Sequence, residues 1–156
     1  MSRLTRFLNF FRINKSIAID LGTSNVLIYD KQKNKIVLNE PSVIVKNRKT
    51  GEIVAVGKEA KEMEGKTAES TVVIRPLNEG EISDIDATRE MLSAFIRQIY
   101  GGSPFRPELM VCVPIEMTSI EKKAIFDAAI GAKKIYLLEE GKAAVVGSGV
   151  NISLPE

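Results

Sequence analysis

Residues 16–30 read SIAIDLGTSNVLIYD, and this stretch decides the fold. Two apolar runs that favour β structure, residues 16–20 and 26–30, enclose the polar segment 21–25. Two such runs joined by a short polar segment that contains glycine are typical of a β-hairpin. The sequence therefore predicts an antiparallel hairpin with a five-residue turn.

The remainder of the chain alternates between short apolar runs and helical patterns. The predicted strands after the hairpin are residues 35–38, 42–46, 53–56, 71–74, 109–113 and 134–138. The predicted helices are residues 58–63, 86–100, 119–129 and 142–147, with Asp84 or Asp86 as the candidate N-cap of the second. Hairpin strands followed by β-α-β-α alternation predict an α/β domain with a mixed sheet. Residues of about 43–80 interrupt the alternation and are interpreted as an insertion.

Composition limits the possible classes of protein. The 156 residues suffice for one ordinary domain. A chain that is 44% hydrophobic and 27% charged is predicted to be soluble and globular rather than disordered or polytopic. The net charge of +2 argues against a nucleic-acid partner. The absence of histidine excludes histidine-based catalysis and histidine-ligated metals, and the one cysteine, Cys112, lies in an apolar run and is predicted to be a buried thiol.

The first 15 residues carry four cations and no acid, which leaves 18 basic and 20 acidic residues in the other 141. At 100° per residue the apolar side chains of this tail form one stripe, flanked by two arginines. The stripe consists of Met1, Leu4, Phe7, Leu8 and Phe11, and the flanking residues are Arg3 and Arg12. This arrangement is typical of a helix lying in a membrane interface, and 15 residues are fewer than the roughly 20 needed to span a bilayer. The alternative is a helix that docks on its own domain or on a neighbouring subunit.

The predicted turn has the composition of a phosphate cradle. Gly22 permits close approach of the backbone to a ligand, while Thr23, Ser24 and Asn25 add hydrogen-bond donors without bulk. Asp20 would repel a phosphate directly, so its predicted role is a contact to Mg²⁺, most simply through water. The alternative is an Asx-type turn in which these side chains satisfy their own backbone.

Further motifs follow at fixed separations. They are residues 39–44 (NEPSVI), 56–57 (VG), 65–67 (GKT), 74–77 (IRPL) with Gly80 and Asp84, and 113–115 (VPI) with Glu121. Together with the turn they resemble the MreB family of bacterial actin homologues. The DLGT turn alone is shared with Hsp70-type chaperones and sugar kinases, whereas NEPSVI and IRPLxxGxIxD at these separations are similar to MreB.

The resemblance implies an actin-like (ribonuclease H-like) fold: the first domain of an ATPase, with a mixed sheet and a small inserted α+β subdomain. On this basis residues 1–15 are a membrane-binding tail, residues 16–44 and 87–156 form subdomain IA, and residues 45–86 form the inserted subdomain IB. The implied function is that of a cytoplasmic, ATP- and Mg²⁺-binding cytoskeletal protein. It would polymerise with itself, lie peripherally on the inner membrane, and direct cell shape and side-wall synthesis with proteins of the cell-elongation machinery.

Glu121 has two interpretations. The resemblance implies a catalytic role, in which this glutamate helps to position the water that attacks the γ-phosphate. The pattern Thr118-x-x-Glu121 is also a capping box, in which the carboxylate bonds back to the start of its helix. The two roles are compatible, and the residues alone favour the cap.

Two departures from the family pattern bear on activity. In the family a second phosphate turn and the adenosine pocket lie beyond the position of Glu156, so these 156 residues are expected to supply one side of a nucleotide clamp and to hydrolyse ATP negligibly alone. Gly141 also stands where the family usually has a proline. A noncatalytic membrane-associated scaffold, or a domain of another actin-fold ATPase such as a chaperone or sugar kinase, remains as an alternative function.

Overall fold

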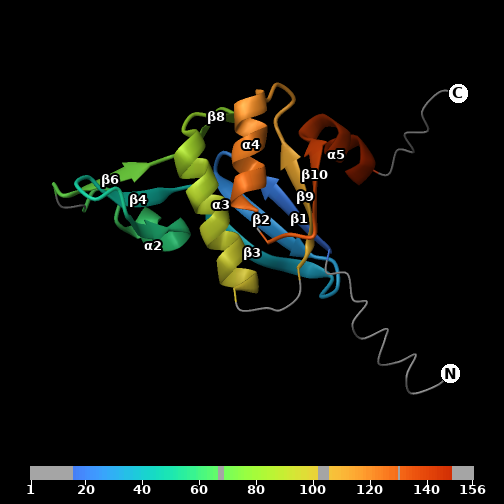
Figure 1. Cartoon of the computed structure of the whole chain (residues 1–156), viewed down its shortest axis with the longest axis horizontal. Helices are drawn as coiled ribbons and strands as arrows, with labels where there is room; N and C mark the ends of the chain where they lie inside the picture. The colour runs from blue at the N-terminus through green and yellow to red at the C-terminus, as the bar shows by residue number, and fades with distance from the viewer. Residues whose placement is uncertain (1–15, 67–68, 102–105, 130, 149–156) are drawn as a thin grey trace, which may run out of the picture.

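The computed structural model describes residues 16–66, 69–101, 106–129 and 131–148 (Figure 1). Its strands are β1 Ser16–Leu21, β2 Asn25–Asp30, β3 Lys35–Pro41, β4 Ile44–Asn47, β5 Ile53–Val56, β6 Thr71–Ile74, β7 Leu77–Asn78, β8 Glu81–Ile82, β9 Glu108–Val113 and β10 Lys134–Glu139. Its helices are α2 Gly57–Glu62, α3 Ile85–Tyr100, α4 Ser119–Ala128 and α5 Glu140–Gly147. The predicted membrane tail, residues 1–15, lies outside the described residues.

The main sheet has five strands in the order β10-β9-β1-β2-β3. β1 and β2 form the predicted antiparallel hairpin, with Leu21 opposite Val26, and β3 continues antiparallel beside β2. β9 is parallel to both β1 and β10, and α4 forms the crossover between β9 and β10. The sheet is therefore mixed, and the predicted α/β class is confirmed.

One face of this sheet carries the main hydrophobic core. Side chains alternate between the two faces of a strand, so every second residue of β1 (Ile17, Ile19 and Leu21) is buried. These side chains share a cluster with Phe95 of α3 and Ile125 of α4, and Figure 1 shows both helices in front of the strands. Burial of a side chain such as Phe95 contributes roughly 1.5–3 kcal/mol, so these contacts fix the helices on the sheet.

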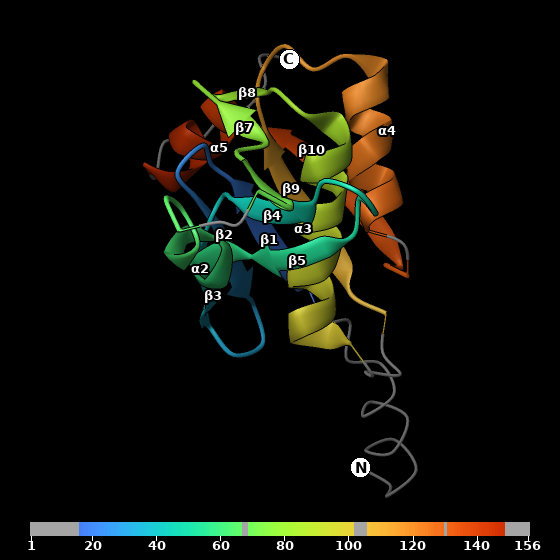
Figure 2. The ribbon, with the colours of Figure 1, turned by 90° about the vertical axis from the view of Figure 1, so that its left-hand side faces the viewer.

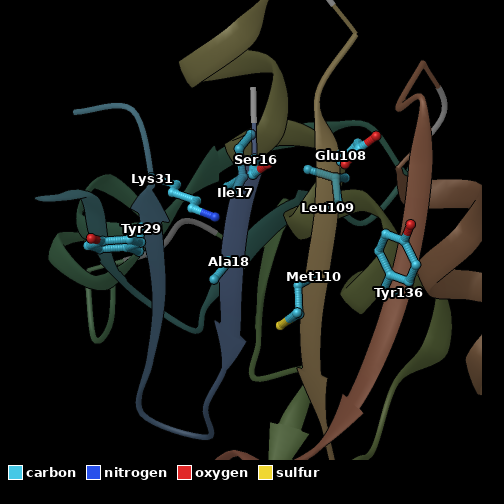
Figure 3. A pocket seen from close by; sticks show the side chains of 9 residues that line it. All are labelled: Ser16, Ile17, Ala18, Tyr29, Lys31, Glu108, Leu109, Met110 and Tyr136. Atoms are coloured by element: carbon cyan, nitrogen blue, oxygen red, sulfur yellow. The ribbon is translucent and has the colours of Figure 1, made fainter. Parts of the chain in front are cut away.

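The other face of the sheet is open among the described residues. Ala18, Tyr29, Met110 and Tyr136 line a groove of about 410 Å³ on it (Figure 3). Met110 is 42% exposed and Tyr136 48% exposed. Cys112 projects to this face, so the prediction that it is buried was wrong: the thiol is half-buried.

A second, three-stranded sheet has the order β5-β4-β6, and a separate two-stranded sheet consists of β7 and β8. The second sheet and α2 enclose a small cluster of Val43, Val45, Ala55 and Ala60. Figure 2 shows β4 and β5 beside α3, and the Lys46–Glu90 ion pair (2.5 Å) joins β4 to that helix. This contact connects the smaller sheet to the main core.

The helix limits follow from local capping. Of the two predicted caps, Asp84 is the one used: its carboxylate accepts a hydrogen bond from the Ala87 amide at 2.9 Å. α3 ends at Tyr100, with Gly101 as its C-cap. None of the described helices is both long and apolar enough to cross a membrane.

Candidate functional site

The carboxyl ends of β1, β9 and β10 meet at one edge of the main sheet, which we call the carboxyl edge. The three strands are parallel and in register, so that Asp20 lies opposite Cys112, and Cys112 lies opposite Leu138. In open α/β sheets, ligands bind outside this edge. The predicted phosphate turn leaves β1 here, which places its polar residues where a ligand would bind.

Gly22 is required in this turn because no side chain fits there. A Cβ atom at Gly22 would lie 2.7 Å from the Asn25 carbonyl oxygen, closer than real contacts allow. The turn is therefore tight, and its backbone is accessible: Ser24 and Asn25 are exposed, and Thr23 is partly exposed. Within the described part of the chain, the Thr23 and Ser24 amides have no hydrogen-bond acceptor. Both amides can therefore donate to a bound anion.

Ser42 donates two hydrogen bonds to backbone carbonyls of the turn. Its hydroxyl donates to the Gly22 carbonyl at 2.6 Å, and its amide donates to the Ser24 carbonyl at 3.0 Å. Ser42 is itself fully buried. These bonds explain why β4 begins at Ile44 and not at the predicted residue 42: the backbone of Ser42 belongs to the turn.

Two further contacts fix the side chains of the turn. The Gly80 amide, at the tip of the β7–β8 hairpin, donates to Oγ1 of Thr23 at 2.8 Å. The Asn25 side-chain amide donates to Oδ1 of Asn39 at 2.5 Å. Thr23 and Asn25 thus bond to distant residues, in contrast to the Asx-type alternative, in which they would bond to their own backbone. Sequence reasoning had not assigned Ser42, Asn39 or Gly80 to the site, although each lies within a motif that carried the family resemblance.

Two acidic side chains, those of Asp20 and Glu140, lie near Cys112 at the carboxyl edge. Asp20 is exposed and does not turn into the core. Burial raises the pKa of the Cys112 thiol, and the negative charges of Asp20 and Glu140 raise it further. The thiol therefore stays protonated at neutral pH, as expected for a cysteine that is not a nucleophile. A phosphate bound here would need a cation between itself and Asp20; among the described residues, no three side chains of the metal-binding types converge.

Glu121 lies in the first turn of α4, and its carboxylate takes part in the predicted capping box. Oε2 accepts hydrogen bonds from the Thr118 amide and hydroxyl, both at 2.7 Å, and the Glu121 amide donates to Oγ1 of Thr118 at 3.3 Å. The capping role is confirmed. β9 ends at the carboxyl edge, and the loop after β9 leads into α4. Glu121 therefore lies in the helix that follows β9 in the chain.

Gly141 does not prevent α5 from forming, since the helix begins at Glu140, two residues before the predicted start. A Cβ atom at Gly141 would meet only Cδ1 of Ile115, at an ordinary 3.7 Å. Lys142 pairs with Glu139 at 2.8 Å and lowers the pKa of that exposed carboxyl through a hydrogen bond and its charge. The first turn of α5 is thus formed without the family's proline.

The profile of the MreB/Mbl protein family matches residues 14–156. The chain is 48% identical to the cell shape-determining protein Mbl of Bacillus cereus over 144 residues, which are 90% of this chain and 43% of that protein. It is 40% identical to the cell shape-determining protein MreB of Escherichia coli K12, covering 96% of this chain and 45% of that protein. The chain therefore spans less than half the length of these curated relatives.

Solved structures with the same fold include the MreB5 protein of Spiroplasma citri bound to ADP, with a TM-score of 0.75 and 34% identity over 92% of this chain and 44% of that chain. A structure of the same MreB5 protein bound to AMPPNP aligns with a TM-score of 0.72. The MamK double helical filament is similar in fold alone, with a TM-score of 0.68 at 20% identity, covering 86% of this chain and 44% of that chain.

Proposed function

The chain belongs to the MreB/Mbl protein family, and from this membership we propose that it supplies the first phosphate-binding turn of an actin-like cytoskeletal protein that determines cell shape. The observation that carries the proposal is the Gly22–Asn25 turn: it admits no side chain at Gly22 and lies at the carboxyl edge. The similar MreB5 protein has been solved with ADP and with AMPPNP, which supports a nucleotide as the ligand.

The amides of Thr23 and Ser24 would donate to the phosphates of ATP, with the Asn25 side chain beside them. Gly22 would allow the phosphates to approach the backbone. Asp20 would hold Mg²⁺ through a water molecule, and the ion would neutralise charge on the phosphates when bound. We propose that these residues form one side of the site and that the remainder of an actin-like protein forms the other. Residues 1–156 alone should therefore bind ATP·Mg²⁺ more weakly than about 0.1 mM.

Calorimetric titration with ATP·Mg²⁺ tests this proposal. Ser24→Glu is the sharpest variant because Ser24 is exposed and its carbonyl bond to Ser42 does not involve the side chain; the added carboxylate would repel phosphate without unfolding the domain. Ser70→Glu, at an exposed position beside β6, is the matched control. We expect weak binding by the wild type and the control, and none by Ser24→Glu. Binding that survives Ser24→Glu would disprove the cradle, and tight binding would disprove the one-sided site.

Hydrolysis is proposed to depend on Glu121, in addition to its cap. Glutamine also forms a capping box, so Glu121→Gln should keep the helix start while removing the charge. In a full-length relative carrying the equivalent change, we expect slower phosphate release with ATP binding retained. An unchanged rate of phosphate release would leave Glu121 with the capping role alone.

We also propose the domain organisation and partners that the family implies. Residues 16–44 and 87–156 would form subdomain IA, residues 45–86 subdomain IB, and residues 1–15 a tail that holds the cytoplasmic protein peripherally on the inner membrane. Self-assembly into filaments is supported by the likeness in fold to the MamK filament. The proposed partners are other copies of the chain and the cell-elongation machinery, with no nucleic acid among them.

Vesicle sedimentation tests the tail. The apolar stripe would enter the lipid and the flanking arginines would contact headgroups. The proposed contacts are Arg3, Leu4, Phe7, Leu8, Phe11 and Arg12. Phe11→Glu places a charge in the stripe and should abolish binding to anionic vesicles. Equal sedimentation of the wild type and Phe11→Glu would disprove the membrane role of the tail.

A further inference from the structure

The open face of the main sheet carries apolar side chains in rows that cross the strands. Paired residues of neighbouring strands share a face, and one such row consists of Tyr136, Met110, Ala18, Tyr29 and Ile36. Ile36, Met110 and Tyr136 of this row are exposed. The next row toward the carboxyl edge consists of Leu138, Cys112, Asp20 and Leu27. A contiguous exposed apolar surface of this kind indicates a site that another element covers.

The groove on this face begins where the tail of residues 1–15 joins the folded domain. Its lining includes Ser16, the first residue of β1, and Ala18. The small side chain of Ala18 lies between the larger side chains of Tyr29 and Met110 (Figure 3). The tail is therefore joined directly to one end of an apolar groove that runs along β1.

The apolar stripe of the tail repeats at nearly the spacing of the rows. Its members Leu4, Phe7 and Phe11 are three or four residues apart, which is about 5–6 Å along a helix. Neighbouring rows are two strand residues apart, which is about 6.6 Å. A helix that folds back over β1 would place Phe7 on the first row and Leu4 on the row that contains Cys112. Residues 12–15 would then supply the reversal of chain direction.

The two ends of the sheet differ in charge, and the difference favours this orientation of the tail. We call the end at which β1, β9 and β10 begin, together with the β2–β3 turn, the basic end. Its exposed cations are Lys31, Lys33, Lys35, Arg106, Lys133 and Lys134. The carboxyl edge exposes Asp20 and Glu140 instead, and neither pairs with a cation in the described part of the chain. A docked helix would bring Arg3 and the positive end of its dipole to this acidic edge.

We propose that residues 1–15 dock as a helix in the groove of the open face, with the apolar stripe on the two rows and Arg3 beside the carboxyl edge. The occupant of the open face is thus a segment of this same chain. The stripe that fills the groove is also the part of the tail proposed above to enter lipid, so a docked tail does not bind a membrane. Docking therefore regulates membrane attachment, and this consequence rests on the proposed function of the tail.

Disulfide formation with Cys112 tests the docking on the whole chain, because Cys112 is its one cysteine and lies on the open face. Leu4→Cys introduces a thiol within the stripe, and Asn9→Cys introduces one on the polar side of the tail as the matched control. A disulfide needs Cα atoms within about 7 Å, so with oxidised glutathione Leu4→Cys should form the intramolecular bond at least about tenfold faster than Asn9→Cys. Equal rates would overturn the proposal. So would a disulfide-linked dimer, since the face would then receive a second copy.

Alkylation of Cys112 by N-ethylmaleimide is an independent measurement on chains without an added thiol. A docked tail covers the row of Cys112, so the alkylation rate follows the fraction of chains in which the tail is undocked. Phe7→Glu places a charge in the stripe and should raise this rate about tenfold. Asn9→Glu adds the same charge on the polar side and should react as the wild type does. Equal rates for Phe7→Glu and Asn9→Glu would mean that the open face has another occupant and would overturn the proposal.

Vesicles of phosphatidylcholine and phosphatidylglycerol separate this inference from the proposed membrane role of the tail. If the tail leaves the groove to enter lipid, these vesicles should raise the alkylation rate of the wild type toward that of Phe7→Glu. If Leu4→Cys forms its disulfide selectively but vesicles leave the alkylation rate unchanged, docking is supported and the membrane role fails. If Phe11→Glu abolishes sedimentation with vesicles but Leu4→Cys and Asn9→Cys form disulfides equally fast, the membrane role stands and docking is rejected.

Discussion

The two ends of the main sheet differ in the sign of the charged side chains that they expose. At the basic end the acids are buried or paired, as Asp30 and Glu108 show, and cations are exposed. At the carboxyl edge Asp20 and Glu140 are exposed beside a turn that offers free amides. The same strands connect both ends. The difference shows how one small sheet can present exposed cations at one end and, at its other end, a turn suited to phosphates and a divalent cation.

The largest expected effect concerns the tight turn at Gly22, which lies at the carboxyl edge. Gly22→Val would place a Cβ atom 2.7 Å from the Asn25 carbonyl oxygen, and the backbone would have to shift. We expect a loss of about 3 kcal/mol in the free energy of unfolding, measured by urea denaturation. Gly147→Val is the control, since a Cβ atom there has no neighbour within 4 Å. Equal urea midpoints for the two variants would mean that the turn is not tight.

The second prediction concerns Asp30, which organises the β2–β3 turn at the basic end. Burial opposes ionisation of Asp30, but hydrogen bonds from the Lys33 amide, the Tyr100 hydroxyl and the Gln32 amide, together with the charge of Lys33, outweigh it and lower the pKa. Burial and the charge of Asp30 raise the pKa of Tyr100, so its hydroxyl remains a donor. Asp30→Asn should lower the free energy of unfolding by about 2 kcal/mol at pH 7. Asp86→Asn, at an exposed position, should leave the free energy of unfolding nearly unchanged.

The pH dependence of this effect has a definite sign. Because the folded pKa is lowered, the contribution of Asp30 is present above the ordinary value of 3.8 and is lost as pH falls through the lowered value. The difference in unfolding free energy between wild type and Asp30→Asn should therefore shrink below about pH 4. A difference that grows on acidification would contradict this account of the basic end.

The sequence predicted the main elements because their signals are local. The hairpin around Gly22 and the helix of residues 86–100 follow from apolar patterning and caps, and both are confirmed. β7 and β8 escaped prediction because strands of two residues carry no periodicity. Cys112 was predicted to be buried because its run is apolar, but strand alternation places it on the open face of the sheet.

The candidate site could be predicted only in part from the sequence, for a similar reason. The residues of the turn are contiguous, so the cradle could be predicted from them. Ser42 and Gly80, which hold the turn, are brought to it by tertiary structure. The basic end was not predicted at all, since Lys31, Arg106 and Lys134 are scattered along the chain and meet only through the pairing of β1 with β2 and β9 and of β9 with β10.

The third prediction tests the start of α4, which follows the carboxyl edge. Thr118→Ala removes the hydroxyl that accepts from the Glu121 amide and donates to its carboxylate. We expect a loss of about 1 kcal/mol in unfolding free energy. Ser119→Ala, which lies outside the box, is the control and should change stability by less than about 0.5 kcal/mol. Equal losses of unfolding free energy in Thr118→Ala and Ser119→Ala would show that the hydrogen bonds of the capping box do not stabilise the domain.

The smallest effect concerns Gly141, in the first turn of α5 beside the carboxyl edge. Gly141→Ala should raise the free energy of unfolding by about 0.5–1 kcal/mol, because alanine loses less backbone entropy in a helix. The added methyl would meet Ile115 at an ordinary distance of 3.7 Å, so no clash offsets the gain. Gly51→Ala, at φ +73° in a loop of the smaller sheet, is the contrasting control and should destabilise. A loss of stability in Gly141→Ala would mean that this edge needs a flexible residue where the family usually has a rigid one.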